Sequence, residues 1–467
     1  MKERYHSVLK SLLNRTFATG MCDKNREMQN DSKRSWLVVL GAFFLVGIAI
    51  GISNSFGVLF TSWTGEFQEN RTKIAWIGSF HFIWYMCLCP ACGILTRYFS
   101  FRPVVVLGST LLCLGLLLSS FVKDIPLFYL TYGVIFGTGT CLLYMSSIIV
   151  LQFCFQRHLA AATGVVSSAS GGFPMWYGPA CEYLIRHYGW RVTLRIVSLF
   201  FIPLLFACAL FPSKKQIPRE KGNGLNVRVT FGRMLKNKRF LIWVLLMVFV
   251  YLGLFVPQVH LISFCKDIGI PTYVSVYNIT LMCSMETAGK VILGRMIDKR
   301  NWSVHTYNIL ALLTLAVSIT LLPLAKTSTH VFIFSIFFGF ARGFQSLCVI
   351  MITPEVSHPD DAKHAVTYLF GALSIPGGVG PVLAGWIFDV TRSYRLAFFI
   401  SGGFFACAGC LANLIEMITA TKTTNRRLVL DSTAKENESE TIVFKAVGYP
   451  KDIPDSVKHA KKSKLIL

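Results

Sequence analysis

Long apolar blocks recur along most of this sequence, and they constrain its fold more than any other feature. Blocks such as residues 36–60 reach about twenty mainly apolar residues, the length that an α-helix needs to cross the hydrocarbon core of a bilayer. Hydrophobic residues make up 53% of the chain and charged residues 15%, against roughly 25% charged residues in ordinary soluble proteins. The sequence therefore predicts an all-α, polytopic membrane protein whose main solvent is the lipid bilayer.

Twelve membrane-spanning helices are predicted, six in each half of the chain. They lie near residues 36–61, 74–96, 103–122, 126–152, 158–181 and 192–212, and then near 240–262, 272–294, 303–323, 330–353, 362–388 and 396–418. The predicted parts are a tail (1–35), a first six-helix half (36–212), a linker (213–239), a second six-helix half (240–418) and a tail (419–467) with the composition of a disordered segment. Two such halves are typical of transporters with a central substrate path.

Lysine and arginine residues indicate how the helices are oriented. The amino-terminal tail, Arg97, Arg157, the basic linker and Arg295 all fall on one predicted side, which the positive-inside rule assigns to the cytoplasm. Both termini are then cytoplasmic, and we expect a multi-pass protein of the plasma membrane. The net charge of +23 is spread over loops and tails, so it does not predict a nucleic-acid partner.

Two turns at corresponding places in the halves carry related sequences. GILTRYFSFRP follows the second predicted span from Gly93, and GRMIDKR follows the eighth from Gly294. Each resembles the short loop with which the major facilitator superfamily locks neighbouring helices, and the resemblance implies a latch at Gly294, Asp298 and Lys299. The first copy departs from that pattern, because Arg97 stands where the superfamily usually has an acidic residue.

Four further segments resemble the monocarboxylate transporter family within that superfamily. They are FQRHLAAATG at 155–164, YGWR at 188–191, FVPQVHL at 255–261 and GPVLAGWIFDVTRSY at 380–394. The likeness covers the membrane region and neither tail. It implies the major facilitator fold, a small carboxylate as substrate, a single-span ancillary protein as partner, and a cytoplasmic gate at Arg157 and His158. Simple positive-inside anchoring is the alternative reading of those two residues.

The eighth predicted span carries a pair of opposite charges, Glu286 and Lys290, one helical turn apart on the same face. An anion that crosses a bilayer needs a positive group inside the protein. The resemblance implies substrate binding and coupling here, where the family usually has an aspartate and an arginine. Lysine lacks the two-pronged donor geometry of arginine. A structural ion pair without ligand contact is the alternative.

Four other polar residues are candidates for the substrate path. Arg342, between Gly339 and Gly343 in the tenth predicted span, would supply the missing carboxylate fork or would instead pair with Glu286 or backbone carbonyls. Asn54, His81 and His260 would contact substrate or only pack between helices. Asn54 also aligns with a first-helix lysine of the proton-coupled family members, which leaves proton coupling open.

These patterns predict a carrier for a small organic acid that works by alternating access, with substrate between the first and seventh helices. No cofactor or metal is expected, and a proton is the one candidate for co-transport. The alternative is a metabolite sensor or scaffold with a transporter fold. An enzyme is not expected, because the sequence has no Gly-x-Ser-x-Gly, His-Glu-x-x-His or phosphate-cradling Gly-Lys-Ser motif.

Overall fold

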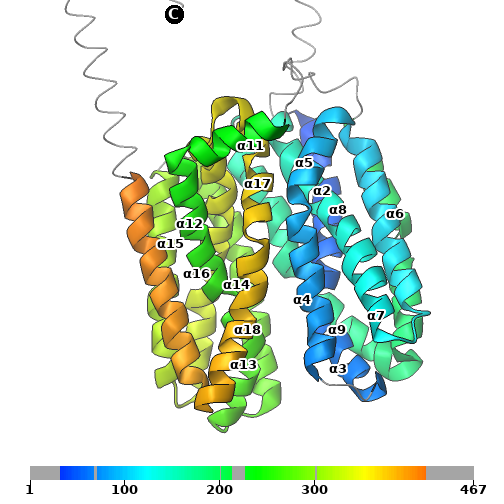
Figure 1. Ribbon diagram of the computed structural model, residues 1–467, viewed down its shortest axis with the longest axis vertical. Coiled ribbons are helices and arrows are strands. Elements are labelled where there is room, and N and C mark those ends of the chain that lie inside the picture. The colour runs from blue at the N-terminus through cyan, green and yellow to red at the C-terminus, as the bar shows by residue number, and fades with distance from the viewer. Residues whose placement is uncertain (1–31, 68–70, 200, 213–226, 300–301, 417–467) are drawn as a thin grey trace, which may run out of the picture. The chain divides into compact units, whose positions relative to one another are not determined.

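The computed structural model describes residues 32–67, 71–199, 201–212, 227–299 and 302–416. Helices supply all of the regular structure in these ranges, and none of these residues lies in a β-strand. The residues up to Asn413 belong to one unit of contacts, which Figure 1 shows as a bundle of long helices.

Ten helical stretches in the described residues are long and apolar enough to cross a membrane. Two differences separate this count from the twelve predicted spans. The stretch Leu159–Ala209 has 51 residues and takes in the predicted fifth and sixth spans together. The predicted eighth span forms a helix of 27 residues, Thr272–Asp298, which is not among the ten because Glu286, Lys290 and other polar residues lower its hydropathy.

The first half is built from helices that follow the predicted spans. Their bounds are α2 Lys33–Asn54, α3 Phe56–Phe67, α4 Arg71–Cys87, α5 Cys89–Tyr98, α6 Phe101–Ser119, α7 Ile125–Phe128, the π-helix η1 Tyr129–Phe136, α8 Gly137–Cys154, α9 Leu159–Ser198 and α10 Phe201–Ala209. The long α9 turns at Gly189, whose φ of 78° is in the left-handed region. Glycine adopts that conformation at little cost, because it has no Cβ.

The second half begins beyond a short helix in the linker, α11 Val227–Lys236. The elements that follow are α12 Lys238–Leu254, α13 Val256–Asp267, α14 Thr272–Asp298, α15 Val304–Leu321, η2 Leu322–Leu324, α16 Ser328–Val356, η3 Pro359–His364, α17 Ala365–Ala372, α18 Ser374–Thr391 and a last helical stretch, Tyr394–Glu416. In Figure 1, α11 lies across one end of the bundle, which we call the linker end.

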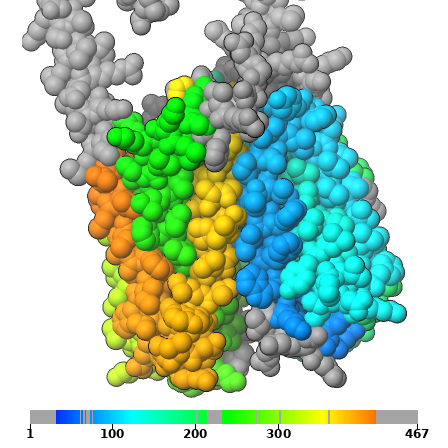
Figure 2. Space-filling model, viewed as in Figure 1, coloured from blue at the N-terminus to red at the C-terminus, as the bar shows by residue number. Residues whose placement is uncertain are grey.

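The two halves meet along two seams. In one seam α4 and α5 pack against α17 and α18, and Figure 2 shows these blue and yellow segments in contact. In the other, α9 packs against α14, where a Cβ on Gly164 would lie 2.5 Å from the Lys290 carbonyl oxygen. Small residues allow helices in a membrane to approach this closely. The close approach places the charged turn of α14 directly against the first half.

Candidate functional site: a buried ion cluster

Glu286, Lys290 and Arg342 form one buried ion cluster between α14 and α16. Lys290 Nζ lies 2.6 Å from Glu286 Oε1, and Arg342 Nε lies 3.3 Å from Glu286 Oε2. Their exposed fractions are 6% for Glu286, 3% for Lys290 and 8% for Arg342. Helical spacing brings the first two together, and the packing of α16 on α14 adds the third. Arg342 is therefore a partner of Glu286, which was one of the two predicted alternatives.

The cluster also reaches the first half of the protein. Lys290 Nζ donates to Ser170 Oγ at 2.9 Å and to the Ser167 carbonyl oxygen at 3.3 Å, both on α9. The Asn54 side-chain amide, at the end of α2, donates to the Ser170 carbonyl oxygen at 3.2 Å. Asn54 thus adjoins the cluster through Ser170. In the sequence, residues 167–174 stand out as a segment of mainly small residues at which the halves could slide or pack tightly, but the contact with Lys290 could not be predicted.

The cluster carries one more positive than negative charge. Four Asp, Glu, Lys or Arg residues are buried in the described part of the chain: Glu286, Lys290, Arg342 and Asp361. Asp361 pairs with Arg97 and Arg233 instead, so two cations and one carboxylate leave a net charge of +1 in the cluster. An unbalanced charge inside a membrane bundle is costly, and an anion would neutralise it.

Arg342 also contacts the aromatic side chain at the junction of α12 and α13. Its guanidinium carbon lies 5.5 Å from the centroid of the Phe255 ring, in a cation–π arrangement. Phe255 in turn meets Phe82 of α4 with ring centroids 5.1 Å apart. The first and seventh predicted helices therefore contribute to the surroundings of the cluster through Asn54 and Phe255.

The two candidate histidines lie in different places. His81 Nε2 is 2.9 Å from Ser53 Oγ, next to Asn54, and its ring stacks on Phe136 of η1 with a centroid separation of 4.8 Å. His260 Nε2 lies 3.0 Å from the Pro381 carbonyl oxygen of α18. His81 therefore lies beside the end of α2. No described contact joins His260 to Glu286, Lys290 or Arg342.

At the linker end, Asp298 joins the two halves. Its carboxylate accepts from the backbone N–H groups of Ala160 and Ala161, at 3.3 and 3.0 Å, in the first turn of α9. Acidic groups favour helix N-termini because backbone donors there are unpaired and the helix dipole is positive. Gly294 allows α14 to approach α9 closely, since a Cβ there would lie 2.7 Å from the Ala160 carbonyl oxygen.

The other predicted gate and latch residues lie beside this contact. His158 Nδ1 is 3.8 Å from Asp298 Oδ2. Arg157 and Lys299 are exposed, and among the described residues neither has a side-chain hydrogen bond or ion pair. The structure thus brings together Gly294, Asp298 and His158, and leaves Arg157 and Lys299 at the surface.

Sequence reasoning missed a second ion cluster at the linker end. Asp361 of η3 lies 3.8 Å from Arg97 Nη2 of α5 and 3.1 Å from Arg233 Nη2 of α11. It is 1% exposed. Arg97, which departs from the superfamily pattern, therefore faces an acidic residue of the other half. The signal available in the sequence was the acidic pair Asp360 and Asp361, immediately before the eleventh predicted span.

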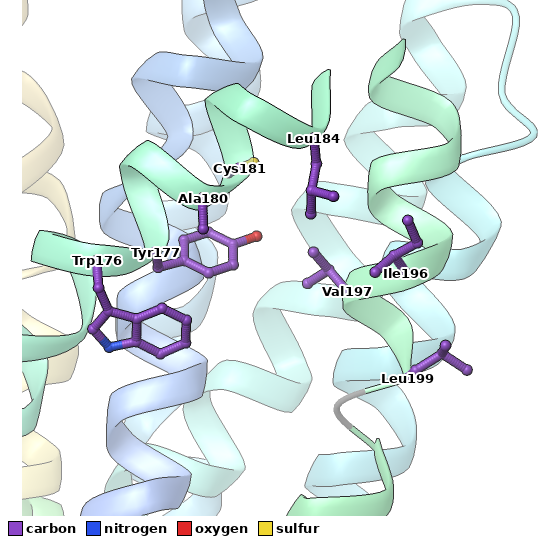
Figure 3. A pocket seen from close by; sticks show the side chains of 8 residues that line it. All are labelled: Trp176, Tyr177, Ala180, Cys181, Leu184, Ile196, Val197 and Leu199. Atoms are coloured by element: carbon purple, nitrogen blue, oxygen red, sulfur yellow. The ribbon is translucent and has the colours of Figure 1, made fainter. Parts of the chain in front are cut away.

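A cavity of about 330 Å³ lies away from these residues, between two parts of α9. Figure 3 shows its lining, which includes Trp176, Tyr177 and Leu199 and is almost entirely apolar. None of the predicted site residues lines it. No group of three His, Cys, Asp or Glu residues suited to a metal ion occurs in the described ranges. The buried ion cluster is thus the candidate functional site.

Comparison with known proteins identifies the class. The profile of the Major Facilitator Superfamily matches residues 39–362 and 287–447, which together cover most of the chain. The chain therefore belongs to the Major Facilitator Superfamily and is a membrane transporter rather than an enzyme. Solved structures agree on the fold. They include the fucose:proton symporter of E. coli (15% identity, 82% of this chain and 98% of that one, TM-score 0.64) and the human organic anion transporter MFSD10 (15%, 81% and 99%, 0.65).

Curated relatives narrow the comparison to one branch of the superfamily. Monocarboxylate transporter 13 of Bos taurus is 27% identical over 385 residues, covering 82% of this chain and 90% of the relative. Monocarboxylate transporter 10 of Rattus norvegicus is 29% identical over 390 residues, covering 79% and 75%. These relatives confirm the predicted resemblance to the monocarboxylate transporter family, at 27% and 29% identity. The comparisons do not favour the sensor or scaffold alternative.

Proposed function

We propose that this protein carries a small carboxylate-bearing metabolite across the plasma membrane by alternating access between its two halves. The observation that supports this most strongly is the net positive charge of the buried cluster at the contact between α14 and α9. The names of the relatives, monocarboxylate transporters and an organic anion transporter, agree with an anionic substrate.

The charge of the cluster suits one carboxylate. A bare carboxylate in hydrocarbon carries a large desolvation penalty, whereas the positive charge of Lys290 and Arg342 would offset that penalty for a carboxylate bound at the cluster. Glu286 already neutralises one of the two cations. One bound monoanion would neutralise the other, so the loaded site would have no net charge.

The same charge balance supports facilitated transport. A neutral loaded site does not need a proton to cross the low-dielectric core. Glu286 is the residue that would take up a proton if one accompanied the substrate, because it is the single buried carboxylate of the cluster. We propose that the carrier works without obligatory proton coupling.

Alternating access would require the linker-end contacts to break and reform. The contacts between halves include Asp298 on the N-terminus of α9 and Arg97 with Asp361. Arg157 and His158 remain candidates for the gate beside Asp298. We propose that the linker end, with both termini, faces the cytoplasm. The single-span ancillary protein that the resemblance implies stays a prediction.

Uptake into proteoliposomes tests this function. The probes are radiolabelled lactate, phenylacetate and phenylalanine, each at an acidic and a neutral external pH. We expect uptake of at least one probe, loss of that uptake to the level of empty liposomes in Lys290→Ala, and no change in Lys326→Ala, which removes an exposed lysine. Unchanged uptake in Lys290→Ala would contradict the role of the cluster. Accumulation driven by a pH gradient would contradict facilitated transport.

A further inference from the structure

The two cations of the cluster differ in how many hydrogen-bond donors they have left. From this difference we infer that Arg342 contacts the carboxylate of the transported anion, and that Lys290 is a positioning residue that holds α14 against α9. The inference rests on the proposed function and assigns separate tasks to the two cations of the cluster.

Lys290 has no donor to spare. An ammonium group donates three hydrogen bonds, and Lys290 Nζ has three acceptors: Glu286 Oε1 at 2.6 Å, Ser170 Oγ at 2.9 Å and the Ser167 carbonyl oxygen at 3.3 Å. The residue is 3% exposed. A carboxylate could bind Lys290 only by displacing one of these partners.

Arg342 has donors without partners. A guanidinium carries five N–H groups, and the contact of Arg342 with an acceptor in the described chain is Nε with Glu286 Oε2 at 3.3 Å. Its Nη1 is enclosed and has no hydrogen-bond partner among the described residues. Buried polar groups are nearly always paired. An acceptor on the bound substrate would satisfy this enclosed, charged donor.

The arrangement also orients Arg342 for a carboxylate. Glu286 holds the Nε edge of the guanidinium, and the Phe255 ring lies against the group at 5.5 Å. The planar guanidinium is thereby fixed, while its Nη1 has no hydrogen-bond partner among the described residues. Such a fork can bind a carboxylate with two parallel hydrogen bonds, which an ammonium cannot do. The fork that the family usually has on the eighth helix is supplied here by the tenth.

Lys290 instead links the two halves. Its partners Ser167 and Ser170 belong to α9 of the first half, while Lys290 belongs to α14 of the second. The backbone of Lys290 also packs closely against Gly164 of α9. These bonds have to change whenever α9 and α14 move apart. Lys290 thus affects transport through the position of the helices, and Arg342 through anion binding.

A matched pair of variants separates the two tasks. Lys290→Met and Arg342→Gln each remove one positive charge, so both leave the cluster with no net charge. The readout is the rise in unfolding temperature that phenylacetate or lactate produces in the purified, detergent-solubilised full chain. We expect Lys290→Met to keep the rise, Arg342→Gln to lose it, and Arg342→Lys to keep a smaller rise because it restores charge without the fork.

A second readout tests the link between halves without any substrate. Met175 Sδ of α9 lies 3.5 Å from Ser284 Oγ of α14, so cysteines at both positions should be joined by a short bifunctional maleimide reagent. The background carries Cys283→Ser to prevent competing pairs. We expect Lys290→Met to slow this cross-linking several-fold and Arg342→Gln to leave its rate unchanged.

The outcomes separate this inference from the proposed function. Loss of the temperature rise in Lys290→Met, with retention in Arg342→Gln, would overturn the assignment and leave the carrier intact. Equal cross-linking rates in Lys290→Met and in the parent would overturn the linking role. If no acid of the uptake panel is bound or carried by the parent chain, the proposed function fails, while the cross-linking result still decides the role of Lys290.

Discussion

At the scale of single residues, Glu286 is the centre of the site. Each of its carboxylate oxygens meets one cation, Lys290 on its own helix and Arg342 on α16. The first pair follows from helical spacing and could be predicted from the sequence. The second was one of two open alternatives. The bonds to Ser167 and Ser170 could not be predicted, because they depend on the register between α9 and α14.

Removal of the central carboxylate should destabilise the fold strongly. Glu286→Gln leaves two buried cations side by side, and breaking a buried ion pair in this way typically costs about 3–5 kcal/mol. Glu182→Gln is the control, because Glu182 pairs with Arg186 on the exposed surface of α9 and such pairs contribute at most about 1 kcal/mol. The unfolding temperature in detergent measures the stability of both variants. Equal stability of the two variants would mean that the cluster is hydrated rather than buried.

At the scale of elements, the two related turns make different contacts with the opposite half. The second copy was predicted to hold a latch, and Asp298 binds the N-terminus of α9. The first copy lacks the acidic residue, and there Arg97 meets Asp361 of η3. The repeat made the position of both turns predictable. The partner of Arg97 could not be predicted, because Asp361 is distant in the sequence and only the fold brings it near.

Replacing each of two glycines by alanine should change the unfolding temperature in opposite directions, because one glycine lies in a close helix contact and the other does not. An alanine Cβ at Gly294 would lie 2.7 Å from the Ala160 carbonyl oxygen, whereas one at Gly409 would have no atom within 4 Å. Alanine is favoured over glycine in a helix by up to about 1 kcal/mol. Gly409→Ala should therefore raise the unfolding temperature slightly, and Gly294→Ala should lower it and slow uptake. A rise in both variants would contradict tight packing of α9 on α14.

At the scale of the whole molecule, most of the fold was predictable because apolar blocks of spanning length leave few alternatives. Some helix bounds differ from the predicted ones by a few residues. The eighth predicted span is helical through Asp298 although its charges make it poorly apolar. The linker was predicted only as a polar segment, yet its described part forms α11, which places Arg233 on Asp361.

The central claim is that the ion cluster faces a passage that opens to each side of the membrane in turn. The most direct measurement is labelling of Ser170→Cys in sealed vesicles, since Ser170 contacts Lys290. A membrane-impermeant thiol reagent is applied from outside or inside, and mass spectrometry of the peptide that contains residue 170 detects the product. We expect labelling from both sides, slowed by phenylacetate. A residue that labels only after unfolding, and from neither compartment before it, would contradict the carrier mechanism.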